Sequence, residues 1–108
     1  MLTIQARATG RELPLAPDRT LPTDGWGPHT LRELIERVVR DDAAALGGLL
    51  PGGAPRDPEL AAALTVQAFE DGLYLVLVDG RRQRDLDAPA PAAPGATLTF
   101  LRLGALAA

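Results

Sequence analysis

The sequence has no cysteine and no lysine, and only 4% of its residues are aromatic. Without cysteine the chain cannot form disulfides, bind metals through thiolates or use a thiolate nucleophile. All 11 basic residues are arginines, which leaves the α-amino group of Met1 as the only ordinary amine for acylation. A GC-rich genome explains the same bias, because alanine, glycine and proline are also abundant. One histidine without a cluster of carboxylates makes a poor metal site, so no metal and no other intrinsic cofactor is expected.

Excess charge of either sign and long apolar runs are also missing. The net charge of −3 offers no basic surplus for nucleic acid or for an anionic membrane surface. No apolar run approaches the about 18 residues that span a bilayer, and Met1–Gln5 has neither the basic nor the apolar region of a signal peptide. We therefore expect a cytoplasmic protein without nucleic-acid or membrane partners. At 108 residues, 46% of them hydrophobic, the chain is long enough for one domain with a modest core.

The first 16 residues predict a β-hairpin. Apolar residues alternate along Leu2–Arg7, as on a half-buried strand, and Gly10 can take the positive φ of a turn. Glu12–Leu15 is the predicted return strand, and its proline suits a sheet edge.

A loop is predicted from Ala16 to His29. It carries the only tryptophan, Trp26, which is either a cap over the edge of the core or an exposed anchor for a partner. His29 is expected to be a solvated loop residue and not a ligand or a base.

Two helices are predicted. Thr30 and Glu33 have the spacing of a capping box, and an apolar stripe follows at helical spacing: Leu31, Leu34, Ile35, Val38 and Val39. Asp57, as N-cap before Pro58, starts a second helix that ends near residue 72. Its expected apolar residues are Leu60, Ala63, Leu64 and Ala68, joined by Val66 or Phe69. The alternative is a strand over Thr65–Phe69.

The last third of the chain predicts two strands and a tail. Leu73–Val78 is apolar at every position, so it is either covered on both faces or it offers one face for binding. A turn follows at Asp79-Gly80. A second strand, Thr97–Leu103, leads into the small-residue tail Gly104–Ala108. Five residues are expected on a partner surface: Trp26, Tyr74, Arg81, Arg82 and Arg84.

Three segments together resemble the β-grasp family of ubiquitin and the small sulfur carriers. Met1–Arg11 resembles the first ubiquitin hairpin, including its Thr-Gly turn. Val76–Arg81 resembles the strand and turn of the sulfur carriers, where Val-Asn-Gly is typical. Pro94–Leu101 resembles their final strand, and Leu101–Leu103 repeats the Leu-Arg-Leu of a ubiquitin tail. The resemblance implies an α+β, ubiquitin-like β-grasp domain over residues 1–103 and a functional tail over residues 104–108.

The resemblance also implies a function. In this family a partner activating enzyme uses ATP to adenylate the terminal carboxylate, which is then transferred to a target. A bacterial modifier of this type works with an activating enzyme, a conjugating enzyme and a JAMM-type peptidase, and is not itself an enzyme. The residues expected in tail binding are Leu101, Arg102, Leu103, Gly104, Leu106, Ala107 and Ala108.

One difference from the family concerns the end of the tail. The family has Gly-Gly where this chain has Ala107-Ala108, and side chains obstruct the narrow channel through which such a tail threads. The alanines are either a replacement of a native Gly-Gly or a natural divergent end. Two alternatives to a modifier remain: a sulfur carrier with a terminal thiocarboxylate, and a β-grasp interaction module that is never conjugated.

Overall fold

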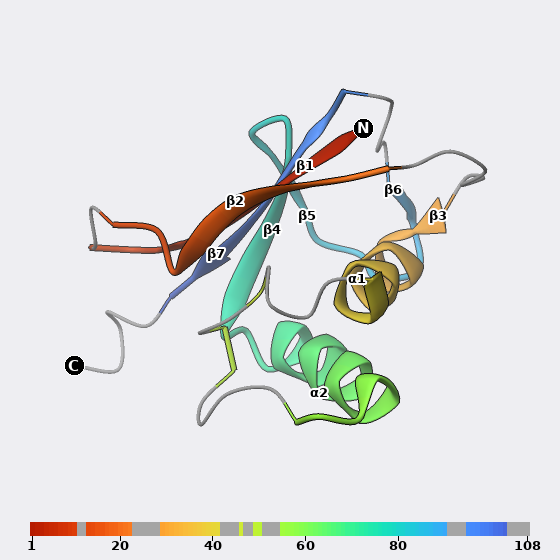
Figure 1. Cartoon of the computed structure of the whole chain (residues 1–108). Coiled ribbons are helices and arrows are strands. Elements are labelled where there is room, and N and C mark those ends of the chain that lie inside the picture. Colours follow the sequence, from red (N-terminus) through yellow and green to blue (C-terminus); the bar gives the residue numbers. More distant parts are fainter. Residues whose placement is uncertain are drawn as a thin grey trace.

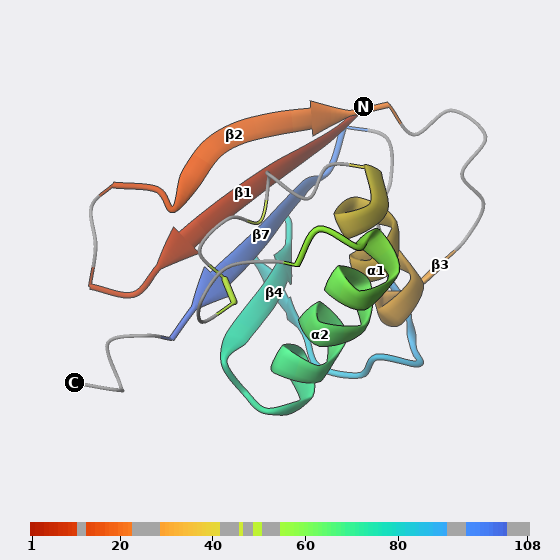
Figure 2. The same ribbon diagram turned by 60° about the horizontal axis from the view of Figure 1, so that its bottom comes forward.

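A computed structural model describes residues 1–10, 13–22, 29–41, 46, 49–50, 55–90 and 95–103. Within these residues the protein is α+β, with a mixed five-stranded sheet, a two-stranded sheet and two helices. Both helices lie on the same face of the larger sheet (Figures 1 and 2). No helix in this part of the chain is long and apolar enough to cross a membrane.

The larger sheet joins the beginning of the chain to its last described strand. Its strand order is β2-β1-β7-β4-β5. The strands are β1 (Leu2–Ala8), β2 (Ala16–Leu21), β4 (Tyr74–Val78), β5 (Arg81–Gln83) and β7 (Thr97–Arg102). β1 and β7 are parallel, whereas the other neighbouring pairs are antiparallel. This mixed arrangement is compatible with the expected β-grasp.

The turn predicted at Asp79-Gly80 is confirmed as the two-residue connection of the β4–β5 hairpin. Asp79 and Gly80 both have positive φ, at 50° and 82°, as a type I′ turn requires. The Asp79 carboxylate also accepts a hydrogen bond from the Thr97 N–H at 2.9 Å. The turn residue thereby connects the hairpin to the start of β7.

The return strand predicted over residues 12–15 is wrong. The strand that pairs with β1 is β2, which starts at Ala16, inside the stretch predicted as a loop. Only its two end residues are buried. β2 therefore lacks the alternation of apolar and polar residues from which a strand can be predicted. The Leu15 N–H still donates to the Ala6 carbonyl at 2.9 Å, and the register shifts between Ile4 and Ala6.

The stretch predicted as a loop also ends in a strand. Residues His29–Thr30 form β3, which pairs antiparallel with β6, Pro89–Ala90. Leu86 lies just before β6 and is buried in the core. The segment that follows the β4–β5 hairpin therefore returns to the start of α1, where the Leu31 N–H donates to the Ala88 carbonyl.

The first helix, α1 (Leu31–Asp41), is confirmed together with its capping box. The Thr30 N–H donates to a Glu33 carboxylate oxygen at 3.0 Å, and the Glu33 N–H donates to the Thr30 hydroxyl at 3.2 Å. The Thr30 hydroxyl also donates to this carboxylate oxygen at 3.0 Å. The bonds from the Thr30 N–H and hydroxyl lower the pKa of Glu33, the backbone N–H having the largest effect. All five residues of the predicted apolar stripe are buried.

The second helix, α2 (Pro58–Glu70), is confirmed over the strand alternative. Its predicted buried face is right at Ala68 and Val66 and wrong at the two leucines and Ala63. Asp57 caps the helix, accepting from the Glu59 N–H at 2.9 Å. Leu60 and Leu64 are 49% and 43% exposed, and Ala63 is exposed as well. The face that packs inward is lined by smaller residues: Ala61, Ala62, Thr65, Val66 and Ala68.

The two helices are also linked at their surfaces. Arg40 of α1 makes two hydrogen bonds with the Glu59 carboxylate of α2, both at 2.9 Å. This fork-to-fork geometry is the strongest form of an exposed ion pair. It raises the pKa of Arg40, chiefly through the hydrogen bonds from its guanidinium to Glu59.

The strand β4 is covered on one face only by the described elements. Tyr74, Val76 and Val78 are buried, whereas Leu75 and Leu77 are only half-buried. The alternation is typical of a sheet with one packed face. Of the two sequence interpretations, coverage of both faces is therefore wrong within the part of the chain that the structure describes.

Candidate functional site: the open sheet face and the end of β7

The backbone at the carboxyl end of β7 is held from both sides. The Thr9 N–H donates to the Arg102 carbonyl at 2.9 Å, and the Leu103 N–H donates to the Leu73 carbonyl at 3.0 Å. The Thr9 hydroxyl lies 3.4 Å from the same Arg102 oxygen. Strand pairing thus continues through Leu103, the last described residue. The position of the backbone at Arg102 and Leu103 is therefore fixed by neighbours that lie about 90 and 30 residues earlier in the sequence.

The side chains at this end point to opposite faces of the sheet. Leu101 is paired with Leu75 on one side and Arg7 on the other, so it belongs to the face away from the helices. Arg102 is paired with Tyr74 and belongs to the helix-covered face, because successive residues alternate. The expected tail residues Leu101, Arg102 and Leu103 are all half-buried.

Several residues expected at the site lie outside the described residues. They are Trp26, Gly104, Leu106, Ala107 and Ala108. Their roles stay predictions.

We call the sheet surface opposite the helices the open face. It is formed by half-buried residues of three adjacent strands: Thr3, Gln5, Arg7, Leu75, Leu77, Thr97, Thr99 and Leu101. Its apolar part comprises Leu75, Leu77 and Leu101. This part adjoins the end of β7, so the apolar patch and the base of the predicted tail form one continuous surface.

Three polar side chains of the open face, those of Gln5, Arg7 and Thr99, have partners within the molecule. Asp18 accepts from Arg7 at 2.7 Å and from Gln5 at 3.2 Å. The Thr99 hydroxyl donates to the Gln5 side chain at 3.1 Å, which extends the network across three strands. The hydrogen bond from Arg7 is the main cause of the lowered pKa of Asp18. Because these groups already have partners, the apolar part is the better contact area for another protein.

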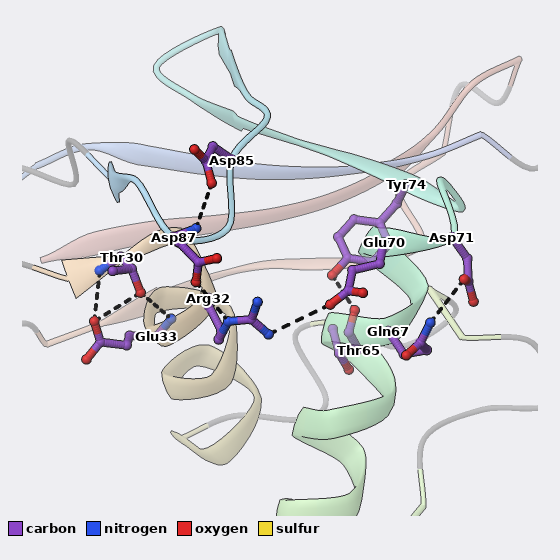
Figure 3. Close-up of polar contacts among 10 residues, drawn as sticks. All are labelled: Thr30, Arg32, Glu33, Thr65, Gln67, Glu70, Asp71, Tyr74, Asp85 and Asp87. Atoms are coloured by element: carbon purple, nitrogen blue, oxygen red, sulfur yellow. Dashed lines mark hydrogen bonds and ion pairs between the residues drawn. The ribbon is translucent and has the colours of Figure 1, made fainter.

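Tyr74 does not belong to a partner surface, and this expectation is wrong. It is 1% exposed, and its hydroxyl donates to the Thr65 carbonyl at 2.7 Å (Figure 3). Burial raises the pKa of its phenol. The odd-numbered residues of β4 point away from the helices. Leu75 and Leu77 therefore occupy the surface on which the sequence analysis placed Tyr74.

The three arginines expected at the surface are exposed. Arg81 and Arg82 lie on the edge strand β5, and Arg84 follows it. Arg82 is paired with Leu77 and therefore borders the apolar part of the open face. In the sheet β4 lies between these arginines and β7, but Arg82, Arg84 and Leu103 line the same groove.

Comparison with family models, with curated proteins and with solved structures finds no match for this chain. In the described part of the chain, no group of three or more His, Cys, Asp or Glu residues is placed to hold a metal ion. The residues that sequence analysis missed are Thr9, Leu73 and the Gln5–Asp18 network. Their roles depend on strand pairing and register, which no local pattern specifies.

Proposed function

We propose that this protein is a ubiquitin-like modifier of the β-grasp family whose carboxyl end is activated and joined to a target protein. The observation that carries the proposal is the position of β7. This strand lies between β1 and β4 at the centre of the sheet, parallel to the first strand. Its carboxyl end is held on both sides up to Leu103. A strand anchored in this way can present the following residues to an enzyme in a fixed direction.

The proposed chemistry belongs to partner enzymes. In the activating enzyme, a carboxylate oxygen of the tail attacks the α-phosphorus of ATP, forming an acyl-adenylate and releasing pyrophosphate. A nucleophile of the partner enzyme then displaces AMP. In the proposal Leu101, Arg102 and Leu103 form the base that the activating enzyme grips. Gly104, Leu106, Ala107 and Ala108 occupy its channel.

The apolar part of the open face supports recognition by these partners. Leu75, Leu77 and Leu101 come together on one exposed side of the sheet, and apolar area next to satisfied polar groups is typical of protein interfaces. An activating enzyme that grips Leu101 would contact this area as well.

The test is an adenylation assay with the chain carrying Ala107→Gly and Ala108→Gly. This chain, ATP and the candidate activating enzyme of the same genome should release pyrophosphate and give an adduct heavier by one AMP. The Leu101→Asp variant should lose most of this activity, whereas Arg56→Asp, a change outside the proposed surface, should keep it. Absence of any adduct with an enzyme that is active on another substrate would contradict the proposal.

A second candidate is an interaction module that is never conjugated. The observation that favours it is the same apolar patch, because an exposed patch can bind a partner without any chemistry at the tail. Truncation after Leu103 separates the two functions: it abolishes a modifier but leaves a binding module intact. Leu77→Asp, in contrast, should abolish partner binding by the module.

A further inference from the structure

A groove lies at the β5 side of the molecule, between the end of α2 and the segment that follows β5. Its volume is about 690 Å³. Phe69 and Glu70 line it from α2, and Arg82 and Arg84 line it from β5 and the segment after it. Leu103, at the end of the last described strand, also contributes to its wall.

The carboxylates of α2 and of the segment after β5 are largely neutralised within the molecule. Arg32 of α1 lies 3.7 Å from Glu70 and 3.3 Å from Asp87, and so connects both walls (Figure 3). The remaining carboxylate on the lining is Asp85, which accepts a hydrogen bond from the Asp87 N–H at 2.9 Å. Each of the two paired carboxylates thus already has a cation beside it.

Two other arginines of the lining do not neutralise carboxylates in the described part of the molecule. Arg82 and Arg84 are exposed, and neither forms an ion pair with any residue that the structure describes. Arg81, next to them in the chain, is exposed as well. The groove therefore has a wall with cationic groups free to bind carboxylates from outside.

The wall between these arginines and α2 is partly apolar. Phe69, Leu75 and Leu103 are half-buried and all line the groove. Half-buried apolar side chains next to unpaired arginines are typical of an interface core with a charged rim. The combination fits a ligand with one large apolar side chain and flanking negative charge.

We propose that this groove binds an acidic peptide segment of a partner protein, with one large apolar side chain of the peptide against Phe69 and Leu103. Arginine forks match carboxylates in a bidentate manner and are enriched at interfaces. A nucleic acid is a poorer occupant, because its binding depends on the neutralisation of many phosphates, whereas this lining offers two arginines without an ion pair to any described residue, on a chain of net charge −3. The site does not depend on the chemistry of the tail, so it stands or fails separately from the proposed modifier function.

The experiment uses a short fluorescein-labelled peptide with a central Leu-Phe pair and aspartate and glutamate on both sides. Binding to the full chain is measured by fluorescence anisotropy at low and high salt. Arg82→Glu and Arg84→Glu should each weaken binding by about fivefold or more, because each replaces an attraction by a repulsion. Arg56→Glu is the matched control: it reverses the charge of an exposed arginine that does not line the groove and should stay within about twofold of the parent.

Amide chemical shifts then locate the peptide. The amides of Gly72, Leu75 and Arg84 should move on titration, and those of β2 should not. Replacing the Leu-Phe pair of the peptide by alanines should also weaken binding, and so should high salt. Circular dichroism of each variant must match the parent, which ensures that lost binding is not lost folding.

Three results would overturn the proposal. The first is no binding of the peptide at low salt. The second is equal binding by the Arg84→Glu and Arg56→Glu variants, or shifts that map away from the groove. The third is a single-stranded oligonucleotide that moves the same amides and binds more tightly than the peptide.

Discussion

Tyr74 connects the second helix to the sheet. Its hydroxyl donates to the Thr65 carbonyl of α2 at 2.7 Å. Its ring centre lies 5.9 Å from that of Phe69, edge to face, and 5.8 Å from that of Phe100 on β7. One side chain of β4 thus contacts both α2 and the neighbouring strand, and its burial is essential to the core.

Replacing Tyr74 by phenylalanine should cost about 1 kcal/mol of unfolding free energy, the usual net contribution of a single hydrogen bond. The ring and its contacts with Phe69 and Phe100 would remain. Urea unfolding followed by circular dichroism measures this change. A midpoint equal to that of the parent would mean that the hydroxyl is not bonded to Thr65.

Burial of this phenol also predicts how stability depends on alkaline pH. Because the pKa of Tyr74 is raised in the folded state, the unfolded chain loses this proton at a lower pH, near 10. Above that pH the unfolded state binds fewer protons than the folded state, so stability falls as pH rises. Tyr74 is the only tyrosine, so the ultraviolet absorbance of tyrosinate should appear together with unfolding. Ionisation near pH 10 in the folded protein would contradict its burial.

The sequence could not assign Tyr74 to a face. Leu73–Val78 is apolar throughout, so it predicts a strand but gives no phase for its alternation. Tyrosine suits a surface and a core equally, since its hydroxyl can reach water or a buried carbonyl. The buried position is stabilised by the Thr65 carbonyl, which accepts the hydroxyl's hydrogen bond. This carbonyl lies near Tyr74 only in the folded arrangement of α2 and β4.

At the level of elements, α1 and α2 show the strength and the limit of sequence patterns. The five large apolar residues of α1 lie on one stripe, and the structure buries all of them. In α2 leucines and alanines lie all round the helix, so the pattern predicts a helix but not its buried face. The face with small residues is the buried one, because Ala61 and Ala62 allow α2 to pack closely against the core.

Two identical substitutions in α2 test this orientation. Ala61→Leu inserts a large side chain at a position that is 0% exposed and should cost about 1–3 kcal/mol through overpacking. Ala63→Leu makes the same change on the exposed face and should change stability by less than about 0.5 kcal/mol. Both substitutions keep good helix formers, so helix propensity cancels in the comparison. Equal losses of stability, or a greater loss for Ala63→Leu, would reverse the assignment of the faces.

The position of the second strand, β2, was predicted wrongly. The sequence pattern predicts residues 12–15 as the partner of β1, whereas β2 runs from Ala16 to Leu21. An edge strand needs few buried residues, and proline and charge on it protect the sheet from unwanted pairing. Pro17 and Asp18 have this character, which made β2 resemble a loop in the sequence.

At the level of the whole molecule, the topology depends on contacts between the two ends of the described chain. β1 pairs with β7 from Thr3↔Thr97 to Ala8↔Arg102. The sequence predicted both strands, and α1, α2 and β4 between them, but it misplaced β2 and did not predict β3, β5 or β6. It could not predict that β1 and β7 pair in parallel, because that register is set by the helices that fill one face of the sheet.

The proposed modifier function requires that the end of this chain becomes covalently attached to another molecule. Intact-mass spectrometry after co-expression with the neighbouring genes tests it most directly, comparing this chain with a version carrying Ala107→Gly and Ala108→Gly. We predict covalent adducts of the glycine version with a protein. Adducts with both versions would show that the pathway accepts alanine. Exchange of one oxygen for sulfur, without a protein adduct, would indicate a sulfur carrier. No mass change in either version would contradict the modifier function and leave the interaction module.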